Sequence, residues 1–77
     1  MYEVIGIQHR KYTNKQGREV EGYNLFVTYE EKEVNGLACM REWVATDVME
    51  DSGVSVGDSV ELNYNRYGRI CSIKPVG

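Results

Sequence analysis

The chain of 77 residues is long enough for one small domain, and it is acidic overall, with 12 acidic and 9 basic side chains and a net charge of −3. A domain of this size buries only about 60% of the surface of its unfolded chain, so we expect a homodimer to supplement its core. The net charge alone argues against a nucleic-acid partner. One histidine and two cysteines without a CxxC spacing predict no metal site.

The sequence lacks the marks of export or membrane insertion. No charged-then-apolar signal segment opens it, and no apolar run approaches the ~18 residues needed to span a bilayer. We therefore expect a cytoplasmic protein. In a reducing cytosol Cys39 and Cys71 are expected to be small buried side chains, with a disulfide between them as the alternative.

The basic side chains are gathered in two stretches that contain no acid, residues 8–18 and 63–77. They are Arg10, Lys11, Lys15, Arg18, Arg66, Arg69 and Lys74. With the exception of Glu3, all the acids lie between positions 19 and 61. Because the field near a surface depends on charges within a Debye length of about 8 to 10 Å, both stretches are expected to be locally basic.

The first two strands are predicted over Tyr2 to Tyr12 and from about Arg18 to Tyr29. Residues 4–7 form a short run rich in β-branched side chains, with Gly6 as a bend point. The polar segment 13–17, closed by glycine, predicts a turn that joins the two strands as an antiparallel hairpin.

Alternation assigns the faces of the second strand. Tyr23, Leu25, Val27 and Tyr29 share one face, so Phe26 lies on the other among polar neighbours. A phenylalanine in that position is either covered by the charged segment 30–33 or another loop, or it is a stacking platform. Gly22 near the start of the strand predicts a bulge or a point of close backbone approach.

A third strand is predicted over Leu37 to Ala45, with Arg41 and Trp43 on one face and Val44 on the other. Because Trp43 adjoins Val44 and Ala45, a core or interface anchor is favoured over a base-stacking residue. Arg41 is surrounded by acids and is expected to form a surface ion pair. Residues 46–52 predict a short helical turn or loop, with Thr46 or Asp47 as the N-cap.

The stretch from Val54 to Pro75 predicts a second hairpin around a turn at residues 65–68. Val60, Leu62 and Tyr64 alternate toward one face of the outgoing strand. In the return strand Ile70 and Ile73 are three residues apart, so they share a face only if the strand contains a bulge.

Five short strands without a long helix, repeat or linker predict one all-β domain over residues 1–77. A long bent first strand and a connection of about ten residues between the third and fourth strands indicate a five-stranded Greek-key barrel of the OB type, and an SH3-like barrel is the alternative. The sequence contains no recognisable acid–base or nucleophile set, so we expect neither an enzyme, nor a cofactor, nor a small-molecule substrate.

Basic residues are interleaved with aromatic residues in both basic stretches. Basic side chains along a groove neutralise the phosphates of a single strand, and aromatic rings stack on its bases. The candidate nucleic-acid-binding residues are Arg10, Lys11, Tyr12, Lys15, Arg18, Tyr23, Phe26, Tyr64, Arg66, Tyr67 and Arg69.

The segments YTNKQGREVEGYNLFV and VGDSVELNYNRYGRI together resemble the small OB-fold single-stranded-DNA-binding proteins of filamentous phages, and more closely short proteins of that kind in phages and mobile elements of Gram-positive bacteria. The resemblance spans most of the chain and implies coating of single-stranded DNA during replication. It places Lys15 and Arg18 on a DNA-binding wing, Tyr23 and Phe26 on or beside its strand, and the hairpin at residues 64–69 at a dimer contact, at the DNA, or at both. The acidic middle of the chain departs from the family pattern.

Two other functions stay open at this point. A protein-interaction barrel, acting as an adaptor of a phage or mobile element, would use the acidic middle or an edge strand. An RNA-binding barrel would differ from the first hypothesis only in its sugar preference.

Overall fold

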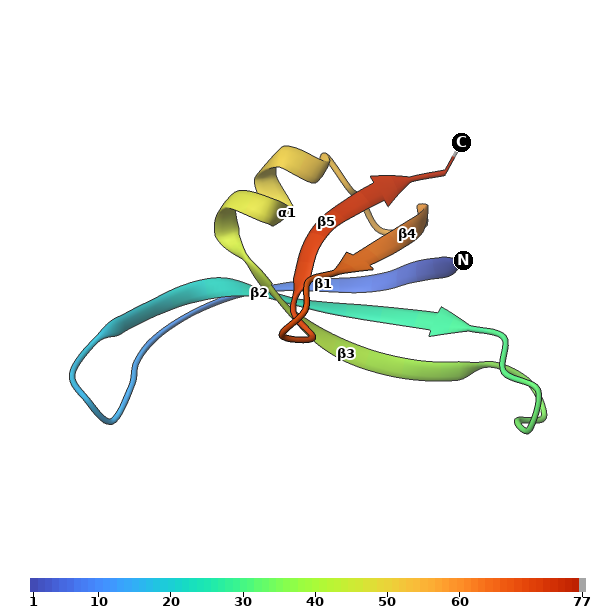
Figure 1. Ribbon diagram of the computed structural model, residues 1–77, viewed down its shortest axis with the longest axis horizontal. Helices are drawn as coiled ribbons and strands as arrows, with labels where there is room; N and C mark the ends of the chain where they lie inside the picture. Colours follow the sequence, from blue (N-terminus) through green and yellow to red (C-terminus); the bar gives the residue numbers. More distant parts are fainter. Residues whose placement is uncertain (77) are drawn as a thin grey trace.

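The computed structural model describes residues 1–76, which fold as five antiparallel strands in one sheet with a short helix (Figure 1). The strands are β1 (Tyr2–Thr13), β2 (Glu19–Tyr29), β3 (Ala38–Ala45), β4 (Ser59–Tyr64) and β5 (Ile70–Pro75), and the helix is α1 (Thr46–Ser52). Their order in the sheet is β3-β2-β1-β4-β5. The predicted all-β domain is confirmed, whereas over the described residues β3 and β5 remain unpaired edges and the sheet is not closed into the predicted barrel.

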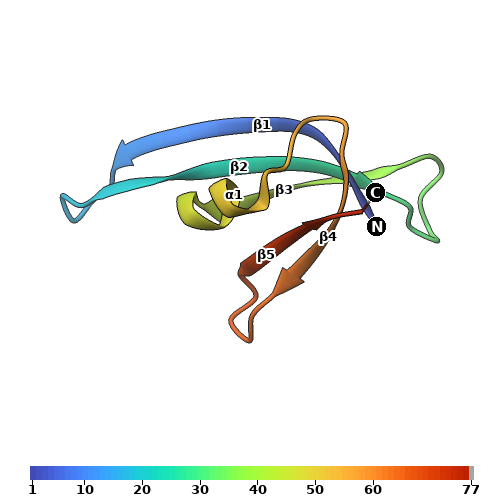
Figure 2. The same cartoon turned by 90° about the horizontal axis from the view of Figure 1, so that it is seen from above.

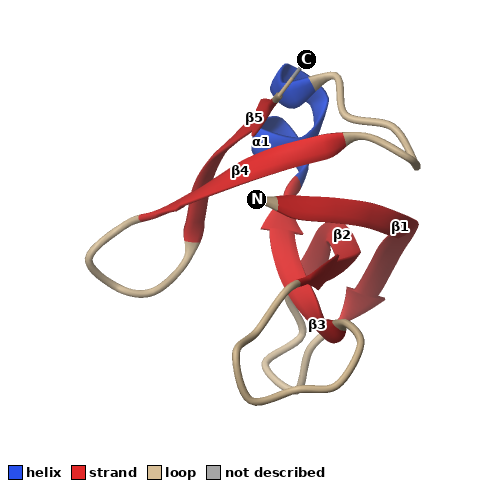
Figure 3. Cartoon of the chain, turned by 90° about the vertical axis from the view of Figure 1, so that its right-hand side faces the viewer, coloured by secondary structure: helices blue, strands red, loops and turns tan. Residues whose placement is uncertain are grey.

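A bulge bends β1 where the sequence predicts a bend. Val4 lies opposite Val27 and Gly6 lies opposite Phe26, so Ile5 is an extra residue in β1. Its side chain is 53% exposed. The bulge turns the strand sharply (Figure 3), which lets its first residues pair with β4 while the rest runs along β2.

Both hairpins close with the same hydrogen-bonded turn. In the turn between β1 and β2, Asn14 Oδ1 accepts from the backbone N–H groups of Gln16 and Arg18, both at 3.0 Å. Gly17 closes that turn with a φ of 78°. Local side-chain-to-backbone bonds of this kind and a positive φ explain why asparagine and glycine occupy these positions.

In the turn between β4 and β5, Asn65 Oδ1 accepts from the N–H groups of Tyr67 and Arg69 at 2.9 and 3.1 Å. Gly68 takes a φ of 77°, and its N–H donates to the Asn65 carbonyl at 3.0 Å. The sequence motif N-x-x-G-R is therefore used twice, each time to close a hairpin with a basic residue just after the asparagine and another just after the glycine.

The bulge predicted for the last strand is confirmed. Asn63 lies opposite Ser72 and Tyr64 lies opposite Ile70, so Cys71 is the extra residue. Ile70 and Ile73 consequently reach the same side and are both buried.

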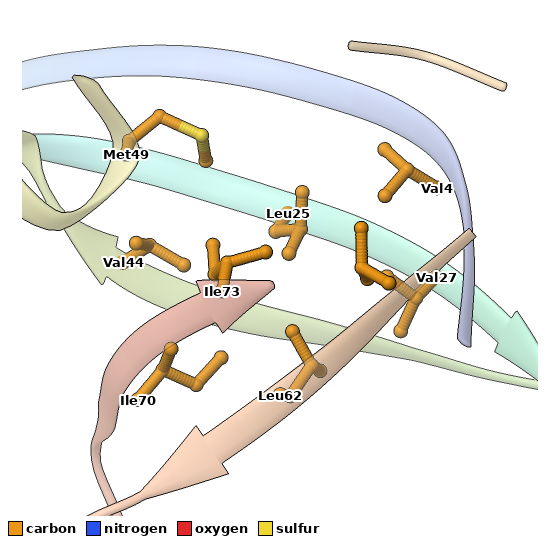
Figure 4. Close-up of a cluster of buried hydrophobic side chains, with 9 residues drawn as sticks. Val4, Leu25, Val27, Val44, Met49, Leu62, Ile70 and Ile73 are labelled. Atoms are coloured by element: carbon orange, nitrogen blue, oxygen red, sulfur yellow. The ribbon is translucent and has the colours of Figure 1, made fainter. Parts of the chain in front are cut away.

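The core lies between β1–β3 on one side and β4, β5 and α1 on the other (Figure 4). Helix α1 contributes Met49 and packs on β5, β2 and β3. Its N-cap is Ala45 and makes no side-chain capping bond, so the prediction of Thr46 or Asp47 as the cap is wrong. The buried hydrophobic residues are Val4, Leu25, Val27, Val44, Met49, Val60, Leu62, Ile70 and Ile73.

The expectation of two buried thiols is wrong. Cys39 and Cys71 are exposed, and within the described chain neither forms a disulfide. Cys39 alternates with Met40 and points away from the core, and Cys71 is the bulged residue of β5. Of the helices in residues 1–76, none is long and apolar enough to cross a membrane.

The faces of β2 predict which leucine the fold depends on. Leu25 is fully buried, whereas Leu37 is 57% exposed in the connection before β3. We expect Leu25→Ala to lower the free energy of unfolding by about 2–4 kcal/mol, because it leaves a cavity in the core. The same change at Leu37 is the control and should alter it by less than about 0.5 kcal/mol. Urea unfolding of the two variants would contradict the assigned faces if their order were reversed.

Candidate nucleic-acid interface

The register of β1, β2 and β3 separates side chains by chemistry. We call the outer face the side of these strands that points away from the core. Alternation and pairing place on it Gly6, Gln8, Arg10, Tyr12, Val20, Gly22, Asn24, Phe26, Thr28, Cys39, Arg41, Trp43 and Ala45. Glu3, which pairs with Thr28 beyond the bulge, is the one acid of the described strands on this face. The outer face therefore combines three aromatic rings with two arginines.

The other acids of these strands, Glu19, Glu21 and Glu42, alternate to the opposite, inner side. Glu21 Oε2 lies 2.7 Å from His9 Nε2, and Glu19 Oε1 lies 3.3 Å from Lys11 Nζ. These contacts compensate the acids of the β1–β2 hairpin locally. They also engage Lys11, which is therefore less available to a phosphate than the predicted set implies.

Two arginines stand on the outer face without a carboxylate partner. Arg10 and Arg41 are exposed, and neither forms an ion pair with the residues that the structure describes. The predicted surface ion pair of Arg41 is wrong. The adjacent acid, Glu42, points to the inner side of β3, whereas Arg41 points to the outer face. Both guanidinium groups are thus free to meet a polyanion.

The Trp43 ring lies close to a glycine on the neighbouring strand. A Cβ atom at Gly22 would stand 2.4 Å from Cζ2 of the Trp43 ring, which confirms the close approach predicted there. Tyr12 meets the same ring edge-on, with centroids 6.3 Å apart. The indole is 38% exposed and does not belong to the core, so the core reading of Trp43 is wrong.

A cleft of about 470 Å³ joins the outer face to the β4–β5 turn. Tyr12, Val20, Trp43 and Ala45 line it from the sheet, Gly68, Arg69 and Ile70 line it from the hairpin, and Glu42 is also in its lining. Two residues predicted from remote parts of the chain, Tyr12 and Arg69, are therefore brought to one place.

The remaining basic candidates occupy the two hairpin tips. Lys15 and Arg18 lie on the β1–β2 turn, at one end of the long axis of the molecule (Figure 1). Arg66 and Tyr67 lie on the β4–β5 turn, where the guanidinium carbon is 5.0 Å from the ring centroid. Figure 2 shows the β4–β5 hairpin projecting away from the plane of β1 and β2. The tips are thus separate, and the outer face lies between them.

The predicted site residues Tyr23 and Tyr64 lie on the inward side of their strands and not on the outer face, and Tyr64 is 41% exposed there. Tyr23 packs against the core and meets the His9 ring at 5.1 Å. Tyr64 continues the inward alternation of Val60 and Leu62. Partial burial and then the neighbouring Glu42 carboxylate raise the pKa of the Tyr64 hydroxyl above its ordinary value of 10.0.

Phe26 is on the outer face, as its alternation with Leu25 and Val27 predicts. Its ring lies against Gly6, where an added Cβ would stand 3.3 Å from Cδ2, and the side chain is half-buried. Tyr2 and Tyr29 form an edge-to-face pair with centroids 5.5 Å apart.

The run of acids at residues 30–33 lies in the β2–β3 connection. This connection is at the end of the molecule opposite the β1–β2 turn (Figure 1). The longest dimension of the molecule is 42 Å, which is several Debye lengths at physiological salt. These acids therefore contribute little to the field at the β1–β2 turn.

Comparisons with protein-family models, curated proteins and solved structures find no match to this chain. Among residues 1–76 no cluster of three metal-binding side chains occurs. The outer face and the cleft are therefore the features that indicate a function.

Trp43 and Arg41 are the site residues that the sequence reasoning missed. Their alternation in β3 was visible, and it placed both on one face. Their role depends on which residues of β2 they face. Trp43 pairs with Asn24, two residues from Gly22, and this pairing is known only from the register between β2 and β3.

Gly22→Ala tests whether the glycine positions the indole. The added methyl group would collide with the ring and with the Val44 carbonyl oxygen, 2.8 Å away. We expect a loss of about 1–3 kcal/mol in unfolding free energy and a shift of the Trp43 emission maximum. Gly6→Ala is the matched control, because it meets only the movable Phe26 ring and should cost less. Equal effects of the two changes would contradict a special role for Gly22.

Proposed function

We propose that this protein binds single-stranded DNA with little sequence specificity. The observation that carries the proposal is the outer face, where Tyr12, Phe26 and Trp43 lie among Arg10 and Arg41 and where Glu3, beyond the bulge, is the one acid of the described strands. Rings stack on bases of any identity, while arginines meet the phosphates between them. Stacking needs bases that are not already paired, so a single strand fits this surface better than a duplex.

The topology supports an OB-type barrel as the finer description of the fold. Its ends, β3 and β5, come near each other without pairing, and OB folds are five-stranded and partly open. OB folds bind oligonucleotides on the face of strands 2 and 3 and with the loops between strands 1 and 2 and between strands 4 and 5. In this chain those loops are the two N-x-x-G-R turns, with Lys15 and Arg18 on one and Arg66 and Arg69 on the other.

The biological role that follows is protection of exposed single strands, as in replication of a phage or a mobile element. The proposal includes no catalysis, because the chemistry required is only neutralisation and stacking. A homodimer in the cytoplasm remains part of the proposal and would extend the binding surface along the strand.

The salt dependence of binding to oligo-dT tests the electrostatic part. The logarithm of the affinity should fall linearly with the logarithm of the salt concentration, with a slope of about −0.7 for each phosphate contacted. Arg69→Gln should make the slope shallower by about 0.7. Lys32→Gln, the same charge change in the acidic connection, is the control and should leave the slope unchanged.

Absent or salt-independent binding would refute the proposal. Recovery of one protein partner that survives nuclease treatment, together with such a result, would favour the protein-interaction barrel. Tighter binding to oligo-U than to oligo-dT would favour the RNA-binding barrel.

Removal of the outer rings tests the stacking part. Trp43→Ala and Phe26→Ala should each weaken oligo-dT binding by about 1–3 kcal/mol at fixed salt, measured by fluorescence anisotropy of a labelled strand. Leu37→Ala, which removes an exposed apolar side chain away from the outer face, is the control. Unchanged affinity in both aromatic variants would show that the rings serve only packing.

A further inference from the structure

Glu42 is the one carboxylate among the described residues that line the cleft. It lies opposite Leu25 in the register, so it is on the inner side of the edge strand β3, and it lines the cleft from that side, half-buried, while Tyr12 and Trp43 line it from the outer face. No basic side chain of residues 1–76 comes within 4.0 Å of it. A carboxylate has acceptor sites for about four hydrogen bonds, and the Tyr64 hydroxyl is a polar neighbour of this one.

A carboxylate at this position is unfavourable for a phosphate and favourable for a donor. The phosphates of a bound strand are expected to stay at Arg69 on the rim, because like charges repel. The cleft volume of about 470 Å³ is within the range of small-ligand sites, and the rings of Tyr12 and Trp43 offer apolar walls. A nucleobase fits these conditions: its faces are apolar, and its edge carries N–H groups.

We propose that the cleft receives one base of the bound strand and that Glu42 makes guanine the preferred base there, an inference that rests on the proposed single-strand binding. Guanine presents two adjacent donors on its pairing edge, N1–H and the N2 amino group, which match the two oxygens of a carboxylate. Adenine and cytosine present one amino group next to a ring acceptor. Thymine presents one N–H between two carbonyl oxygens, which the carboxylate repels.

The single-stranded state is what makes this edge available. In a duplex the pairing edge of guanine is occupied by cytosine, whereas proteins read it in unpaired strands. The general surface then binds any sequence, and the cleft adds a preference at one nucleotide.

The test compares oligo-dT strands of about 10 nucleotides, within the site sizes of OB folds, that carry one central guanine, inosine, adenine, cytosine or thymine. Inosine keeps N1–H and lacks the N2 amino group. By competition anisotropy we expect the guanine strand to bind about 5-fold to 10-fold more tightly than the thymine strand. This ratio is at the lower end of the discrimination that a bidentate contact gives. The inosine strand should lose most of that gain.

Variants connect the preference to the carboxylate. In Glu42→Gln the guanine-to-thymine affinity ratio should fall toward one, because the amide accepts and donates and so pairs with either base. The ratio is the readout because loss of a negative charge strengthens binding to all strands alike. Glu33→Gln, the same charge change in the acidic connection, is the control and should keep the ratio of the unmodified protein. Glu42→Ala repeats the test without any side-chain hydrogen bond.

Two results overturn the inference while leaving single-strand binding intact. One is equal affinity for all five strands, and the other is a guanine preference that persists in both Glu42 variants. Failure to bind any of the strands would instead overturn the proposed function itself.

Discussion

The alternation of side chains along β1, β2 and β3 is the constraint on which both the core and the proposed site depend. Successive residues of a strand point to opposite faces, so a shift of one residue exchanges the two faces completely. In this sheet the inner set supplies Leu25, Val27 and Val44 to the core, and the outer set supplies the rings and arginines. A slipped β2 would expose the core leucine and turn Glu19 and Glu21 outward. Stability and charge separation are therefore selected by the same register.

Two bulges keep that register compatible with a curved sheet. The extra residue Ile5 lets Val4 and Ile7 face the core although they are three apart, and the extra residue Cys71 does the same for Ile70 and Ile73. The sheet can bend at these points without turning apolar side chains outward. The bend in β1 is also what allows it to pair with β2 and β4, so that the β4–β5 turn comes to the cleft.

Local chemistry made the hairpins, their turns and the last bulge predictable. Asparagine followed three residues later by glycine closes a turn by itself, and two isoleucines three apart require an extra residue between them. The exposure of Trp43 was not predictable in this way, since its neighbours Val44 and Ala45 are apolar and suggest burial. Its position depends on Gly22, which lies 21 residues earlier and meets it only through the pairing of β2 with β3. Closure of the sheet is likewise a property of edges that are distant in sequence.

Two of the outer rings, Phe26 and Trp43, each contact a glycine on a neighbouring strand. These contacts distinguish them from isolated hydrophobic side chains on a surface. Phe26 lies against Gly6 and Trp43 against Gly22, and the Trp43 contact is the tighter of the two. A glycine inside a strand lowers its stability and is favoured where another group must approach closely. A ring confined as Trp43 is loses little further freedom when a base stacks on it, so less of the stacking energy is consumed by ordering.

The acidic total charge is compatible with a polyanion partner because of where the acids lie. Those of the β1–β2 hairpin are on the inner side beside His9 and Lys11, and those of the β2–β3 connection are at the far end of a molecule 42 Å long. A phosphate at the β1–β2 end of the outer face, beside Arg10, is therefore many ångströms from the acids of the β2–β3 connection, whose field is screened over a Debye length. Glu3 and Glu42 are the exceptions: Glu3 shares the outer face beyond the bulge, and Glu42 lines the cleft, where the proposed contact is to a base edge.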